Sequence, residues 1–136
     1  PFAVQEAADK APVAPGALYF APSGYHLSIE RDRRFSLSCE PPVLFSRPAI
    51  DLLMGSAADA YGPALVGVLL TGANEDGAQG LLRIRQAGGL TVVQDPAEAL
   101  VATMPRAAIA AHAPDFVLPL REIRALLLQL DSAHAH

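Results

Sequence analysis

The chain has 136 residues, a size typical of one compact domain, and 51% of them are hydrophobic. Its net charge of −4 and its pI near 5.4 argue against nucleic acid or an anionic membrane surface as a partner. The single cysteine excludes an internal disulfide, no apolar run reaches 18 residues, and no basic leader with an apolar core opens the sequence. These features predict a cytoplasmic protein without membrane insertion.

Short apolar stretches alternate with turn residues over the first 40 positions. The stretches at 18–20, 26–29 and 35–39 have the length and composition of strands, and a weaker one lies at 2–4. The charged segment 31–34 is expected to be a solvated turn between the last two stretches. The pattern predicts an antiparallel hairpin or meander at the amino-terminal end.

An amphipathic helix is predicted next, with Ser46 as its N-cap and Pro48 in its first turn. Its apolar residues follow the i, i+3, i+4, i+7 spacing up to Tyr61, and Gly62 with Pro63 ends it. The segment 64–70 is then apolar without alternation. Such a run is typical of a strand that is covered on both faces in a parallel sheet.

Helices and strands alternate in the remainder of the chain. Helices are predicted at about 81–87, 104–111 and 121–130, strands at 90–93 and 116–118, and a frayed tail at 132–136. The last helix is expected to turn Ile123, Leu126, Leu127 and Leu130 inward. With the strand at 64–70, the order is β-α-β-α-β-α, for which right-handed crossovers predict a doubly wound, mostly parallel α/β sheet in one domain over 1–131.

Asp76 is the main candidate for chemistry, because it follows the apolar strand in a glycine-rich turn and precedes a helix. The carboxyl ends of strands in open α/β sheets are where ligands and catalytic groups gather. Two interpretations stay open. The carboxylate caps the helix that follows it, or it is the acid of a hydrolase triad that orients a histidine.

Other kinds of site are not indicated. Gly72, Gly77 and Gly80 match neither the dinucleotide-binding nor the nucleoside-triphosphate loop pattern. The four histidines have no partner at zinc-ligand spacing, so neither a metal nor another cofactor is expected. A triad of Ser23, His26 and Asp76 is a weak candidate, because Ser23 lacks the strand–turn–helix setting of a nucleophile.

Several motifs, in one order along almost the whole chain, resemble those of one family. They are LTG at 70–72 with DGA at 76–78 and Gly80, AGGLT at 87–91 with QDP at 94–96, MPRAAI at 104–109, and, upstream, LYFAP at 18–22, HL at 26–27 and RP at 47–48. This series resembles the catalytic domain of the bacterial chemotaxis protein-glutamate methylesterases, the CheB family. The resemblance implies a three-layer α/β/α serine hydrolase.

The resemblance also implies roles for particular residues. Asp76 corresponds to the acid of a Ser-His-Asp triad, and the loop of Thr71, Gly72, Ala73, Asn74 and Gly77 to the oxyanion and active-site loop. Ala73 stands where the family usually has a methionine whose backbone amide serves the oxyanion hole. Met104 and Pro105 correspond to the rim of the site.

The serine and histidine motifs of the family do not occur in this sequence. We expect the chain to be the carboxyl-terminal portion of a catalytic domain whose first strands are missing, so that it supplies only Asp76 and is inactive alone. With the amino-terminal remainder as partner, the implied activity is hydrolysis of glutamyl methyl esters, and glutamine deamidation, on chemoreceptor helices. The alternative is a non-catalytic module that docks on receptor helices or on a signalling partner.

Overall fold

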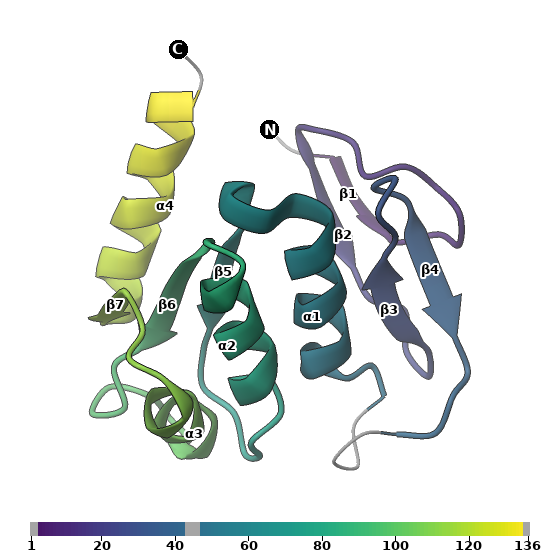
Figure 1. Ribbon diagram of the computed structural model, residues 1–136. Coiled ribbons are helices and arrows are strands. Elements are labelled where there is room, and N and C mark those ends of the chain that lie inside the picture. The colour runs from purple at the N-terminus through teal and green to yellow at the C-terminus, as the bar shows by residue number, and fades with distance from the viewer. Residues whose placement is uncertain (1–2, 43–46, 135–136) are drawn as a thin grey trace.

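The computed structural model describes residues 3–42 and 47–134, with side chains up to Asp131. Figure 1 shows two parts side by side: four short amino-terminal strands with α1, and a parallel sheet with the remaining helices. The strands are β1 (Ala3–Glu6), β2 (Ala17–Phe20), β3 (His26–Ile29), β4 (Phe35–Ser38), β5 (Val66–Leu69), β6 (Leu90–Gln94) and β7 (Phe116–Leu118). The helices are α1 (Ile50–Tyr61), α2 (Ala78–Gln86), α3 (Thr103–Ala111) and α4 (Leu120–His134), with a 3₁₀ turn η1 (Gly62–Ala64) after α1.

The predicted parallel sheet is present in the order β5-β6-β7. Both strand pairs are parallel, and the register places Val68 opposite Val92 and Val93 opposite Val117. Helices α2 and α3 pack on one face, where Leu69, Leu81, Ile84 and Val93 form the main core. Helix α4 packs on β6 through Ile123, which is 3% exposed. Together these elements give the α/β fold that the sequence predicts.

Strand β5 is covered on one face only. A Cβ on Gly67 would lie 2.6 Å from Ile84 Cδ1, which shows how closely α2 approaches that face. Because side chains alternate along a strand, Val66 and Leu70 point to the other face. Both are exposed there, Leu70 by 40%. The expectation that both faces are covered is therefore correct for the α2 side alone within the described residues.

The open face of β5 borders an apolar groove of about 1180 Å³ beside α4. Leu100 lies at this groove with 91% of its surface exposed, and Leu127 and Leu128 of α4 line it with 41% and 54% exposed. Of the residues expected to face inward, Ile123 is buried, whereas Leu127 is exposed. The reason is that nothing among the described residues packs against this side of α4.

The amino-terminal strands form two separate pairs. The predicted hairpin is confirmed for β3 and β4, which are antiparallel with Leu27 opposite Leu37. The wider meander is wrong, because β2 pairs in parallel with β1 and not with β3. A parallel pair needs a long connection, and residues 7–16 provide it.

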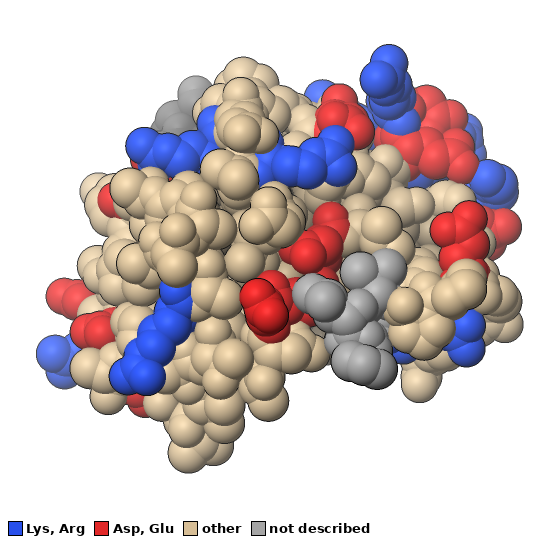
Figure 2. Space-filling view, turned by 60° about the horizontal axis from the view of Figure 1, so that its bottom comes forward, with Lys and Arg blue, Asp and Glu red and all other residues tan. Residues whose placement is uncertain are grey.

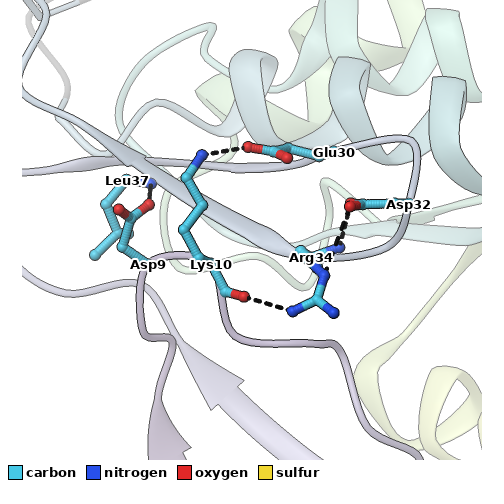
Figure 3. Close-up of polar contacts among 6 residues, drawn as sticks. All are labelled: Asp9, Lys10, Glu30, Asp32, Arg34 and Leu37. Carbon is cyan, nitrogen blue, oxygen red and sulfur yellow. Dashed lines mark hydrogen bonds and ion pairs between the residues drawn. The ribbon is translucent and has the colours of Figure 1, made fainter.

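The connection between β1 and β2 is tied to the hairpin by backbone and side-chain contacts (Figure 3). The amide of Lys10 donates to the carbonyl of Phe35 at 2.8 Å, and Asp9 Oδ1 accepts from the amide of Leu37 at 3.0 Å. The Lys10 ammonium lies 2.6 Å from Glu30 Oε1, and this hydrogen bond raises the pKa of Lys10. Arg34 donates to the carbonyl of Lys10. These contacts hold the two pairs together although they share no strand.

The hairpin packs against α1. Ser56 Oγ accepts a hydrogen bond from the amide of Ile29 at 2.9 Å and donates to the carbonyl of Leu53. The turn at 31–34 is exposed as predicted, and its Arg33 lies 4.5 Å above the ring of Tyr61. Leu27 and Phe35 form the centre of a second, smaller core on this side. Helix α1 therefore stands between the amino-terminal strands and α2.

The predicted start of α1 and the predicted end of α4 differ from the structure. The proposed N-cap Ser46 lies outside the described residues, and Ala49 precedes the first turn of α1. Helix α4 continues to His134, so residues 132–134 are helical where a frayed tail is expected. The remaining positions of that tail, 135 and 136, lie outside the described residues.

A polar cluster closes the amino-terminal end of β6. Asp115 Oδ2 accepts from the amide of Thr91 at 2.8 Å, and His112 Nε2 lies 3.3 Å from Thr91 Oγ1. Burial, aided by the charge of Arg85, lowers the pKa of His112. Backbone hydrogen bonding from Thr91 lowers the pKa of Asp115.

The lowered pKa of His112 predicts a pH dependence of stability. Unfolded His112 takes up a proton near pH 6.5 and the folded form only at lower pH, so the free energy of unfolding falls as pH drops below about 6.5. In His112→Gln this contribution is absent, and the decline between about pH 7 and pH 5 should be shallower. Urea unfolding at several pH values measures both slopes. Equal slopes for the wild type and His112→Gln would show that the lowered pKa of His112 does not cause the decline.

Candidate active-site loop

The loop from β5 to α2 lies at the carboxyl edge of the parallel sheet, where the sequence places the chemistry. Asp76 is 2% exposed. Its Oδ2 accepts a hydrogen bond from the amide of Ile50 at 2.6 Å, and its Oδ1 accepts one from the amide of Asp51 at 2.9 Å. Asp76 therefore does cap a helix, but that helix is α1 and not α2, the helix that follows it in sequence.

The amides at the start of α2 are in turn capped by Asp51, a residue of α1. Asp51 Oδ1 accepts hydrogen bonds from the amides of Gly77 and Gly80, both at 2.8 Å. Each carboxylate thus meets the amide groups at the start of the other helix, where the helix dipole favours negative charge. We call the arrangement of Asp51 and Asp76 the crossed caps. It explains why two buried or half-buried acidic residues are tolerated so close in space.

The backbone around Asp76 is fixed on both sides. Asn74 Oδ1 accepts a hydrogen bond from the amide of Asp76 at 2.9 Å, and Gly77 is held by Asp51. Gly77 has φ +103°, a conformation that favours glycine, and a Cβ there would lie 2.6 Å from Leu69 Cδ1. The glycine allows the chain to turn sharply under Asp76 and enter α2.

The first half of the loop is tied to the segment before α3. Thr71 Oγ1 accepts a hydrogen bond from the amide of Val101 at 2.8 Å and donates to its carbonyl at 3.0 Å. The amide of Gly72 donates to the same carbonyl, and the carbonyl of Gly72 accepts from the amide of Met104. A Cβ on Gly72 would lie 2.5 Å from Met104 Cε, so glycine leaves room for that side chain.

The loop residues predicted from the sequence therefore form one connected structure, but only part of it is open. Met104 is 8% exposed and Pro105 is buried, so both support the loop from below and do not form an open rim. Ala73 and Thr71 are exposed beside them. The exposed peptide at Ala73 lies between the two tied ends of the loop.

Sequence reasoning gave no role to Asp51, nor to Gln94, although Gln94 belongs to the QDP motif. Gln94 Oε1 accepts a hydrogen bond from the amide of Thr71 at 2.9 Å, and Gln94 Nε2 donates to Glu98 at 3.1 Å. Asp51 could have been noticed as an acidic residue in the first turn of a predicted helix. Its contact with Gly77 could not be predicted, because the two residues lie 26 positions apart in the sequence and meet only in the folded chain.

His26 does not form a triad with Asp76 in this structure. The amide of Ala49 donates to His26 Nδ1 at 3.2 Å, and His26 Nε2 lies 2.9 Å from the carbonyl of Pro41. The imidazole is 3% exposed and serves to hold the segment that enters α1. Ser23 is exposed in the turn before β3, whereas both ring nitrogens of His26 are engaged by backbone partners. The weak triad candidate is thus not assembled.

The face at the carboxyl ends of β5 and β6 carries charges of both signs. In Figure 2 acidic side chains lie near its centre and also at its edges, where basic side chains lie among them. Within the described ranges, no three His, Cys, Asp or Glu side chains come together in a way that could hold a metal ion. Nor is any described helix long and apolar enough to cross a membrane.

Fold and loop together define an α/β domain whose polar loop lies at the carboxyl edge of a parallel sheet, as in many α/β enzymes. The family model described as CheB methylesterase matches residues 1–127. The crystal structure of the Thermotoga maritima CheB methylesterase catalytic domain superposes with a TM-score of 0.86 at 32% identity, covering 92% of this chain and 68% of that one. The chain belongs to the CheB methylesterase family, as its motifs suggest.

Two curated relatives carry related names. A putative protein-glutamate methylesterase/protein-glutamine glutaminase of Leptospira interrogans is 51% identical over 128 residues, covering 94% of this chain and 66% of that protein. The protein-glutamate methylesterase FrzG of Myxococcus xanthus is 44% identical, covering 93% of this chain and 38% of FrzG. The chain therefore spans a little under two thirds of the first relative and well under half of the second.

The geometry at Gly77 predicts a specific loss of stability. Gly77→Ala combines a left-handed backbone with a clash against Leu69, so it should lower the free energy of unfolding by about 2–5 kcal/mol. Gly24→Ala is the matched control, because Gly24 has φ +80° but open space around its Cβ position. It should cost only about 1–2 kcal/mol. Urea unfolding of both variants tests this, and equal losses would show that the space at Gly77 is not limiting.

Proposed function

We propose that this chain is the carboxyl-terminal portion of a protein-glutamate methylesterase catalytic domain, which hydrolyses glutamyl methyl esters on chemoreceptor helices and deamidates receptor glutamines. Asp76 is the acid of a Ser-His-Asp triad in this proposal. The serine and the histidine come from protein that lies outside these 136 residues. Membership in the CheB methylesterase family and the names of the relatives support the reaction class. The place of action would be the cytoplasm.

The observation that carries the proposal is how the Asp76 carboxylate is held. A carboxylate offers about four acceptor positions, and the amides of Ile50 and Asp51 use one on each oxygen. Capacity remains for an imidazole N–H. The fixed carboxylate could then set the tautomer of that imidazole and stabilise its charged form, as the acid of a triad does. Its low exposure keeps water from competing for the same positions.

In this mechanism the serine attacks the ester carbonyl while the histidine takes up its proton. The exposed peptide at Ala73 is held on its amino-terminal side by the contacts of Thr71 and Gly72 and on its carboxyl-terminal side by the contact of Asn74, so it is suited to donate its amide to the oxyanion. A backbone donor needs no particular side chain, so alanine in place of the usual methionine keeps it. Methanol leaves, and water then releases glutamate from the acyl-enzyme.

The amino-terminal partner would occupy the open side of the sheet. Within the described part of the chain, β5 pairs only with β6, which leaves its other edge without a strand. The exposed side chains of Leu70, which directly follows β5, and of Leu127 and Leu128 in α4 line the adjacent groove. A further parallel strand with its helix would bury them and bring its own carboxyl end beside Asp76. The relatives' additional length supports such a segment.

Replacement of Asp76 tests the proposed role in the full-length protein that contains these residues. Asp76→Asn should lower kcat for a methylated receptor by about 10⁴-fold, because an amide no longer fixes the histidine. It should also lower stability by about 1–3 kcal/mol, since its NH₂ group faces an amide donor of α1. Methanol release measured on folded protein gives the rate.

Glu75→Gln is the control for this variant, because Glu75 is the exposed neighbour and its side chain has no part in the loop contacts. Its rate should stay within about twofold of wild type. Near wild-type methanol release by folded Asp76→Asn would overturn the catalytic assignment. That result would favour the alternative of a module that docks without chemistry.

A further inference from the structure

We infer that Asp51 is a positioning residue for Asp76: its carboxylate sets the place of the acid by holding the backbone on the far side of the loop. This inference rests on the proposed catalytic role of Asp76. Asp51 contacts neither substrate nor reacting atoms in this scheme. It acts through the amides of Gly77 and Gly80 and through its own backbone amide.

Asp51 is linked to Asp76 directly and also through the neighbouring residue Gly77. The backbone amide of Asp51 donates to Asp76 Oδ1, while the side chain of Asp51 accepts from Gly77, the residue next to Asp76. These two hydrogen bonds, together with the covalent bonds within Asp51 and from Asp76 to Gly77, form a closed ring between α1 and the loop. A closed ring fixes both the position and the direction of the Asp76 carboxylate.

Helices α1 and α2 approach each other closely beside this ring. A Cβ on Gly80 would lie 2.7 Å from Met54 Cβ and 3.1 Å from Asp51 Cα, so glycine permits the contact. Further along the same two helices, Arg83 and Asp59 form an exposed ion pair at 3.1 Å. Asp51 and Asp59 therefore both bridge α1 and α2, but only Asp51 touches the loop.

The ring brings two carboxyl side chains close together. Each of the two carboxylates accepts two backbone N–H groups at the start of a helix. These donors offset the repulsion between two acidic side chains held in one ring. Removal of the Asp51 carboxylate takes away two of the four bonds and frees the backbone at Gly77, so Asp76 loses its fixed direction while keeping its own charge.

Kinetics of the full-length protein test the inference. Asp51→Ala should lower kcat for methanol release by roughly ten- to hundredfold, the cost of misplacing a catalytic group by about 1 Å, with KM unchanged. Asp51→Asn keeps an acceptor oxygen and should recover most of that loss. Asp59→Ala removes the other bridge between the same helices, and its kcat should stay within about twofold of wild type.

Hydrogen exchange supplies a readout that does not depend on activity. The amides of Ile50 and Asp51 should exchange faster in Asp51→Ala than in Asp59→Ala, because Asp76 no longer holds them firmly. If Asp51→Ala and Asp59→Ala agree in kcat and in exchange, the inference is wrong. If exchange changes as expected but Asp76→Asn is active, the proposed function fails and the positioning of Asp76 stands.

Discussion

The crossed caps between α1 and α2 are the interaction on which this molecule depends. Helix α1 begins on the Asp76 carboxylate, and α2 begins on the Asp51 carboxylate. Because each helix start is satisfied by the other element, neither can move without exposing buried donors. The same four bonds fix the one carboxylate that the proposed chemistry needs. Structure and function therefore share their main constraint.

Much of this fold could be predicted from pattern alone. The apolar run before Thr71 and the strands at 90–93 and 116–118 identify the parallel sheet, because period and composition are local properties. The pairing of β2 with β1 could not be read, since a parallel partner depends on a distant connection. Asp76 could be predicted as a candidate site residue because it follows an apolar strand. The helix that Asp76 caps, and the contacts that Asp51 makes, could not be predicted, because both depend on how α1 packs against the loop.

The two faces of the parallel sheet differ in how they are packed. The side of α2 and α3 holds the core around Leu81 and Val93 and supports the loop through Met104. The other side carries α4 and an apolar groove that the exposed Leu70 helps to line. A continuous apolar strand indicates two covered faces, so the open face is where a further segment of the domain fits best. Under this account the chain brings the acid, and the segment brings the nucleophile and the base.

A structure of the full-length protein containing these residues tests the central claim most directly. The account predicts a histidine nitrogen within about 2.6–3.2 Å of an Asp76 carboxylate oxygen. The amides of Ile50 and Asp51 should still be bonded to the same carboxylate. A structure in which those caps persist but no imidazole comes within reach of Asp76 would contradict the account, and Asp76 would then be a helix cap alone.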